Sequence, residues 1–168
     1  YYLNIEMVQL KKHEEKTNVM RILEQRKIPY KSHDYSNTGA ISGIDVITAL
    51  GENPDTAFKT LVTTSKSKKH YVFLVPVSKD LDLKLAAKAV NEKKISMLKS
   101  KELLPLTGYE HGGCSPIGMK HEFPTIIDKS ATKYNTIFFS GGRVGSQIEM
   151  SLDDLKKVIN FKLANISK

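Results

Sequence analysis

Two glycine-rich segments and one lysine are the parts of this sequence whose residue types could do chemistry. The first segment, residues 107–120, reads TGYEHGGCSPIGMK, and the second, residues 140–145, reads SGGRVG. A glycine loop between regular elements lets a ligand approach main-chain N–H groups with no side chain in the way. One such loop alone is usually an ordinary turn. Two of them, together with Lys59 inside an apolar run, indicate a binding site.

Lys59 and Thr60 lie in the run AFKTLV, which predicts a strand with these two side chains on opposite faces. A lysine there either extends to solvent at an edge or points into a pocket, where it could hold a phosphate or polarise a carbonyl. Thr60 is either a core threonine or a hydroxyl donor, and Ser140 is either a turn residue or a hydroxyl aimed at a substrate. Tyr35 ends a short predicted strand, a position more typical of a core than of a site.

Cys114 is the single cysteine, and we do not expect it to act as a nucleophile. A nucleophile needs a base in reach, and no base with an orienting partner is apparent, so a small packed side chain is expected. His111 and Cys114 have a metal-like spacing, but there is no second ligand pair, and no metal or other cofactor is expected. A lone cysteine excludes an intrachain disulfide and suits a reducing cytoplasm.

The composition fits one globular domain with a basic surface. The chain has 168 residues, 40% of them hydrophobic, and a formal charge of +8. Such an excess favours a polyanionic partner, most simply nucleic acid, although a solvated lysine-rich surface explains it equally well. No apolar run approaches the ~20 residues of a membrane span, and no signal peptide is apparent at the start. We expect a lead segment over residues 1–16 and a single domain over residues 17–168.

The hydrophobic pattern predicts an α+β fold on a mixed, largely antiparallel sheet. Strands are expected over residues 30–35, 56–64, 70–77, 94–98, 124–128 and 136–139, with 56–64 and 70–77 paired as a hairpin. Helices are expected to begin at caps, because short polar side chains accept hydrogen bonds from the first turn. The caps are Thr17, Ser42 with Asp45, Asp82, and Ser151 with Asp154, and a further short helix is expected over residues 100–104.

Two predicted helices have specified buried faces. The helix after Asp82 is expected to bury Leu83, Ala86, Ala87 and Val90, and the helix after Ser151 to bury Leu152, Leu155, Val158 and Ile159.

The same residues, in order, resemble the YbaK-type aminoacyl-tRNA deacylases, which are related to the editing insertion domain of bacterial prolyl-tRNA synthetase. The matching pieces are FKTLV (58–62), LDLK (81–84), AAK (86–88), KK (93–94), TGY (107–109), GG (112–113), SP (115–116), Gly118, PTIID (124–128), SGG (140–142), IE (148–149) and DL (154–155). The resemblance covers about residues 17–166 and is greatest to the Cys-tRNA(Pro) deacylase branch.

The resemblance implies a bent mixed sheet, partly barrel-like and surrounded by helices. It also implies a cytoplasmic enzyme that clears cysteine from mischarged tRNA(Pro), acts beside prolyl-tRNA synthetase, and binds neither DNA nor a membrane. The implied catalytic residues are Lys59, Gly112 and Gly113, and the implied substrate-binding residues are Tyr35, Thr60, Ser140, Gly141 and Gly142. The sequence departs from the family pattern at two positions on the pocket rim. A family phenylalanine falls near Ser42, and a family aspartate falls on Gln147.

The implied mechanism needs no catalytic base from the protein. A cysteinyl ester carries its own thiol, which can attack its own carbonyl and expel the tRNA, while the protein supplies position and charge stabilisation. Two other readings stay open. One is a hydrolase for Ala-tRNA(Pro) or another mischarged tRNA, and the other is a non-catalytic module that binds tRNA or associates with a synthetase.

Overall fold

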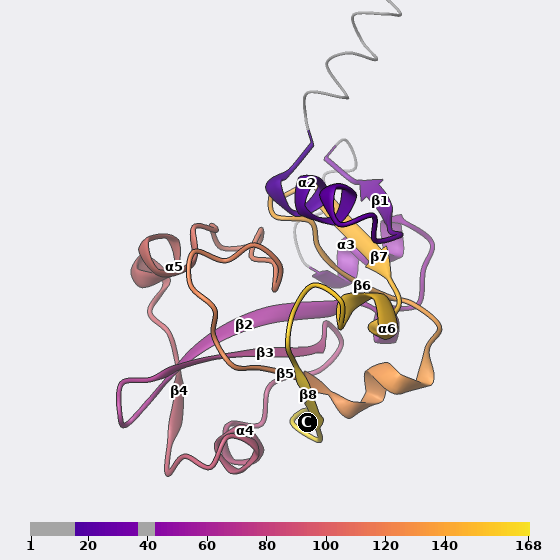
Figure 1. The fold of residues 1–168 in the computed structure, drawn as a ribbon. Helices are drawn as coiled ribbons and strands as arrows, with labels where there is room; N and C mark the ends of the chain where they lie inside the picture. Colours follow the sequence, from indigo (N-terminus) through magenta and orange to yellow (C-terminus); the bar gives the residue numbers. More distant parts are fainter. Residues whose placement is uncertain (1–15, 37–42) are drawn as a thin grey trace, which may run out of the picture.

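In the computed structural model, which describes residues 16–36 and 43–168, the strands form two sheets (Figure 1). The smaller sheet is antiparallel and has the order β1–β7–β6, with β1 at Lys31–Asp34, β7 at Ser146–Met150 and β6 at Ile137–Ser140. The larger sheet has the order β4–β2–β3–β5–β8. Its strands are β2 (Phe58–Ser65), β3 (His70–Pro76), β4 (Ile95–Met97), β5 (Thr125–Asp128) and β8 (Lys162–Ala164).

The predicted hairpin and the mixed character of the sheet are confirmed. Strands β2 and β3 pair antiparallel, as do β2 and β4, whereas β3, β5 and β8 pair in parallel. The two sheets meet at one parallel bridge between Ala57 and Phe138. The α+β class is therefore as predicted. The strands form two sheets joined at a corner, and among the described strands no closed barrel forms.

The helices lie around these sheets and begin largely where the caps predict. They are α2 (Asn18–Gln25), α3 (Gly43–Ala49), α4 (Leu83–Ala89), α5 (Ser100–Thr107) and α6 (Leu152–Leu155), with 3₁₀ turns at Pro54–Thr56 and Lys129–Lys133. Thr17, Asp82 and Ser151 each accept main-chain N–H bonds from the first turn of their helices. The predicted cap at Ser42 lies outside the described residues, as does the lead segment up to residue 15.

The structure corrects the predicted end of the last helix. The helix after Ser151 has only four residues, because the N–H groups of Lys157 and Val158 bond three residues back and tighten the chain into a turn. Val158 and Ile159 still pack against the core, but from this turn. Strands β7 and β8 were not predicted. Leu83, expected to be buried, is 38% exposed at the first turn of α4. Of the other predicted residues, Ala86 and Ala87 are buried and Val90 is partly buried against the same core.

Two hydrophobic cores lie on opposite sides of the larger sheet. One contains Phe58 and Val62 of β2 with residues of α2, the smaller sheet and the first glycine-rich segment. The other contains Phe73 of β3 with Ala86 and Ala87 of α4. A third, smaller cluster joins Ala57 and Phe138 at the corner to Ile47 of α3. The glycine-rich segments are thus fixed to the first core.

Candidate active site

The two glycine-rich segments, far apart in sequence, pack against each other. A Cβ added to Gly113 would lie 2.9 Å from Arg143 Cα and 3.0 Å from both Arg143 C and Val144 N. Gly112 has a φ of +84°, a left-handed conformation that glycine adopts readily, and a Cβ there would lie 3.4 Å from Val144 Cγ2. The structure therefore brings the predicted site glycines of both loops together, and Gly113 is needed for their close approach.

The internal hydrogen bonds of the loops leave Gly112 as the best donor for a ligand. The N–H of Gly113 already donates to the Glu110 carbonyl at 3.0 Å. The N–H of Gly141 donates to the Ser146 carbonyl at 2.9 Å, and that of Gly142 to Ser140 Oγ at 3.2 Å. In the described part of the chain, the N–H of Gly112 makes no such bond. Ser140 therefore acts as a turn residue here, one of the two roles its sequence context allows.

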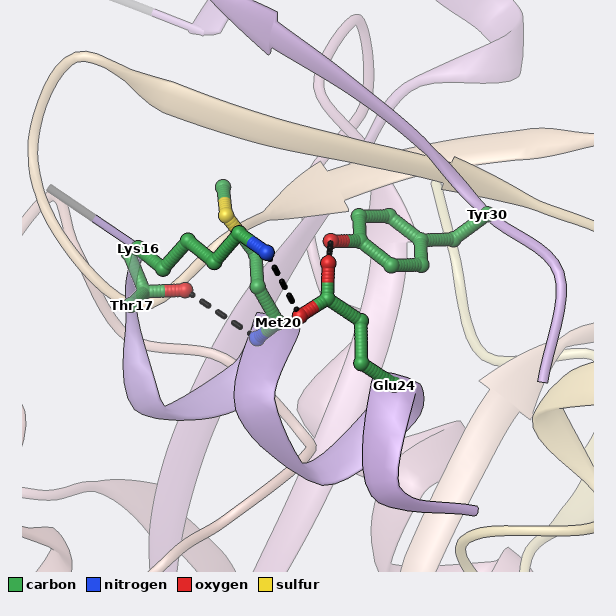
Figure 2. Close-up of polar contacts among 5 residues, drawn as sticks. All are labelled: Lys16, Thr17, Met20, Glu24 and Tyr30. Carbon is green, nitrogen blue, oxygen red and sulfur yellow. Dashed lines mark hydrogen bonds and ion pairs between the residues drawn. The ribbon is translucent and has the colours of Figure 1, made fainter. Parts of the chain in front are cut away.

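Helix α2 holds the second glycine loop in place. A Cβ on Gly142 would lie 3.1 Å from Val19 Cγ2, so this loop lies directly on the start of the helix. Figure 2 shows polar contacts that run from the start of α2 to its last turn: Glu24 accepts a bond from Lys16 Nζ at 2.9 Å and another from the Tyr30 hydroxyl at 3.0 Å. Burial, followed by the hydrogen bond and charge of Glu24, raises the pKa of Tyr30 to about 12. Tyr30 therefore stays protonated and ties α2 to the start of β1.

The sheet corner places Lys59 and Ser140 on one face. Ala57 and Phe138 form a parallel bridge, and Lys59 and Ser140 each follow two residues later. Because strand side chains alternate, both residues point to the face of the bridge pair. Ser140 is paired with Gln147, and Gln147 with His33. Lys59, Ser140 and Gln147 therefore share the face that carries the corner cluster.

Lys59 is held only weakly. Its Nζ lies 3.6 Å from Asp80 Oδ1, and the two side chains are 35% and 82% exposed. An ion pair this exposed contributes little to stability. The Lys59 ammonium can therefore exchange Asp80 for an anionic group of a ligand without disturbing the fold.

Two buried polar atoms near this corner have no hydrogen-bond partner within the described part of the chain. They are Thr60 Oγ1 and Gln147 Oε1. Thr60 shares the face of Phe58 and Val62, so Thr60 and Lys59 point to opposite sides of β2, as the alternation predicted. Unsatisfied buried polar atoms are costly in a folded protein and are usual at sites that bind a polar ligand.

Tyr35 connects β1 to the second glycine loop. Its side chain is buried, and its N–H donates to the Gly145 carbonyl at 2.8 Å. Tyr35 thus lies in the core, as is typical of a tyrosine in such a position. It borders the loop that holds Gly141 and Gly142.

The structure also shows a polar group that the sequence reasoning missed. His33 Nε2 lies 2.9 Å from Glu149 Oε1, and the Thr136 hydroxyl donates to Glu149 Oε2 at 2.7 Å. Burial opposes the charge on Glu149, but the bonds from Thr136 and His33 outweigh it and lower the pKa of this carboxyl. The signal was the alternation of polar residues in β1 and β7, which face each other across the antiparallel pair.

Cys114 is a packed side chain, as predicted. It is 7% exposed within the first core, and burial raises the pKa of its thiol to about 12 although Thr107 contributes an opposing hydrogen bond. A thiol with this pKa holds almost no thiolate at neutral pH, so Cys114 is unsuited to nucleophilic attack.

Residues 42–158 match the model of the aminoacyl-tRNA editing domain, and the chain belongs to this family. It is 41% identical over 158 residues to EbsC of Enterococcus faecalis, covering 94% of this chain and 96% of EbsC. The name of EbsC gives it, provisionally, as a Cys-tRNA(Pro)/Cys-tRNA(Cys) deacylase. Over 64 residues the chain is also 34% identical to YwhH of Bacillus subtilis, covering 38% of this chain and 41% of YwhH.

Solved structures share the fold. A protein described provisionally as a trans-editing enzyme for prolyl-tRNA synthetase superposes with a TM-score of 0.79 at 22% identity, covering 90% of this chain and 98% of the other. The protein APE2540 superposes with a TM-score of 0.82 at 18% identity, covering 90% of this chain and all of the other. The resemblance stated from the sequence is thus confirmed for both family and fold. Within the described residues, no helix has the length and apolar character that crossing a membrane requires.

Proposed function

We propose that this protein is a trans-editing deacylase that removes cysteine from mischarged Cys-tRNA(Pro). The observation that carries the proposal is the 41% identity to EbsC, which extends over nearly all of both chains. A role in translation fidelity beside prolyl-tRNA synthetase, in the cytoplasm, follows from the same proposal. The +8 charge suits a tRNA substrate.

The reaction uses the thiol of the substrate. The cysteinyl sulfur, as thiolate, attacks the carbonyl carbon of its own ester. A carbon–sulfur bond forms, the bond from that carbon to the ribose oxygen breaks, and the oxygen takes up the proton that the thiol released. The products are a tRNA with free terminal hydroxyls and a cyclic thioester of cysteine. Because the nucleophile belongs to the substrate, the protein needs only to position the ester and stabilise the developing oxyanion.

The predicted site residues divide these tasks. Lys59, weakly held by Asp80, holds the phosphate or ribose at the 3′ end. The free N–H of Gly112 donates to the carbonyl oxygen, and Gly113 keeps the loop close enough to the second loop to aim it. On the face of Lys59, Gln147 Oε1 offers a hydrogen bond that the described residues leave unused, and Thr60 Oγ1 offers another on the opposite face of β2. Tyr35, Ser140, Gly141 and Gly142 shape the second loop around the substrate.

The proposal is tested by following ester loss from labelled Cys-tRNA(Pro), Cys-tRNA(Cys), Ala-tRNA(Pro) and Pro-tRNA(Pro) under single-turnover conditions. We expect fast loss of the cysteinyl esters and background loss of the other two. Lys59→Ala serves as the site variant, and Lys84→Ala, an exposed lysine on α4, is the matched control. Preferred loss of alanine from Ala-tRNA(Pro) would establish the other hydrolase reading. Binding without any ester loss would establish the non-catalytic module.

A further inference from the structure

A groove of about 730 Å³ lies at the hairpin end of β2 and β3, between β4 and α5. In Figure 1, α5 and β4 flank this end of the two long strands. Apolar side chains of Met97, Leu98 and Leu106 line the groove, and Met97 is 45% exposed. The groove therefore offers a mainly apolar floor that is open to solvent.

Three lysines stand over this apolar surface. Lys68, Lys99 and Lys101 line the groove, and all three are exposed. Within the described part of the chain, none of the three forms an ion pair with a carboxylate. Among the described residues that line the groove, Glu102 is the only acidic one. Clustered unpaired cations raise the local potential and attract a polyanion.

The groove opens on the same face of β2 as Thr60. Thr60, Val62 and Thr64 alternate onto one face, and Thr64 lines the groove. Thr64 follows Thr60 by four residues, a separation of about 13 Å along an extended strand. The unpartnered Thr60 hydroxyl and the groove therefore lie along one side of the strand, a few nucleotides apart.

We propose that this groove binds the acceptor stem of the tRNA whose 3′ end reaches Thr60. The inference rests on the proposed deacylase function. Lys68, Lys99 and Lys101 contact consecutive backbone phosphates, and the apolar surface at Met97 receives ribose or a base edge. RNA helices are bound mainly through backbone and shape, which suits lysines on flexible stems over a shallow apolar floor. An acidic segment of a protein partner is the competing occupant.

The binding test compares two variants of equal charge. In the groove variant Lys68, Lys99 and Lys101 are changed to Gln. In the control variant Lys84, Lys129 and Lys133, which are exposed and do not line the groove, are changed to Gln. Affinity for uncharged tRNA(Pro) is measured by fluorescence anisotropy from 50 to 200 mM salt.

Each lost phosphate contact lowers the slope of log affinity against log salt by about 0.9. For the groove variant we therefore expect a slope smaller in magnitude by about 2 to 3 than that of the control variant. Between 50 and 200 mM salt, the affinity of the groove variant should then fall by a factor about 40-fold smaller than that of the control. Equal slopes for the two variants would overturn the proposal. A second pair of variants tests the floor: Met97→Glu is expected to weaken tRNA binding more than Leu163→Glu, which places the same charge at an exposed site on β8.

A kinetic test separates the groove from the proposed function. The groove variant is expected to raise KM at least 10-fold for Cys-tRNA(Pro) and to cleave 3′-O-cysteinyl-adenosine, which has no stem, at the wild-type rate. If the groove variant lost activity equally on Cys-tRNA(Pro) and on 3′-O-cysteinyl-adenosine, the groove would not be a stem-binding surface. If no protein cleaves either ester, the deacylase function fails, whereas the binding slopes still decide the groove. Loss of binding to prolyl-tRNA synthetase with unchanged tRNA binding would identify a protein surface instead and refute the proposal.

Discussion

Gly113→Ala is the substitution that most directly tests the packing of the two glycine loops. A Cβ at this position would meet three main-chain atoms of Arg143 and Val144 at 2.9 to 3.0 Å. Ordinary contacts begin at 3.4 Å, so the loops must separate by about half an ångström. The obstacle is backbone, which cannot rotate out of the way as the end of a flexible side chain can.

The expected cost follows from this geometry. Forcing one extra carbon into a tightly packed site typically costs about 1–3 kcal/mol. Gly113 does not have a positive φ, so an alanine is not strained there by its own conformation. Without the clash, Gly113→Ala would instead stabilise the protein by about 0.4–1 kcal/mol, because alanine lowers the conformational entropy of the unfolded chain. The sign of the stability change therefore distinguishes close packing from a loose loop.

The assay is urea unfolding at pH 7, with single-turnover loss of the ester from Cys-tRNA(Pro) measured in parallel. We expect Gly113→Ala to lower the free energy of unfolding by about 1–3 kcal/mol and to slow the reaction, because Gly112 shifts with its neighbour. Gly51→Ala is the control: its φ is +74° and a Cβ would meet no atom within 4 Å. The Gly51→Ala variant should lose about 1 kcal/mol of stability, because alanine adopts a positive φ less readily than glycine, and should keep full activity.

An unchanged or increased stability of Gly113→Ala would refute the close approach of the two loops. Loss of stability with unchanged activity would show that the loops touch but that Gly112 does not bind the substrate.

Further predictions concern the site lysine, the cysteine and metal. Lys59→Ala should slow deacylation by about 30- to 1000-fold, which corresponds to the 2–4 kcal/mol of a preorganised donor, and should leave the circular dichroism spectrum unchanged. Lys59→Arg should not restore the rate. Full activity in Lys59→Ala would show that Lys59 does not belong to the site. Burial raises the Cys114 pKa from 9.0 to about 12, so its stabilisation is complete below pH 9 and is lost as pH rises toward 12. Between pH 8 and pH 10 the free energy of unfolding, measured with urea, should therefore fall by about 1.4 kcal/mol more in the wild type than in Cys114→Ala. Equal decreases in the two proteins would contradict the buried thiol. Cys114→Ala should keep most of its deacylase activity. Elemental analysis of the purified protein should find no stoichiometric zinc, and one zinc per chain would contradict the absence of a ligand set in the sequence.

Local chemistry made much of the fold predictable. Caps at Thr17, Asp82 and Ser151 are set by hydrogen bonds within a few residues, and the β2–β3 hairpin joins neighbours in the chain. The short strand β7 pairs with the neighbouring β6 and with β1, which is far away in sequence, and β8 pairs with the distant β5. Their pattern alone was too brief to show them. The early end of α6 has the same origin, since the chain turns to reach β5.

The candidate site was predictable in its residues but not in its arrangement. Glycine content identified both loops, yet only the structure shows that Gly113 lies against Arg143. Of the four predicted site glycines, Gly112 is the one whose N–H makes no hydrogen bond within the described part of the chain. Strand alternation placed Lys59 and Thr60 on opposite faces. The bridge between Ala57 and Phe138, a contact across two sheets, is what brings Ser140 and Gln147 to the side of Lys59.

The central claim, that the thiol of the substrate expels the tRNA, is tested most directly by comparing Cys-tRNA(Pro) with Ser-tRNA(Pro) in one single-turnover experiment at pH 7. The two esters differ by one atom, sulfur or oxygen. A few per cent of a thiol is ionised at this pH, whereas a hydroxyl is almost wholly protonated. We expect rapid loss of the cysteinyl ester and loss of the seryl ester near the uncatalysed rate. Equal rates would contradict the central claim, by showing that an activated water or a group of the protein attacks the ester.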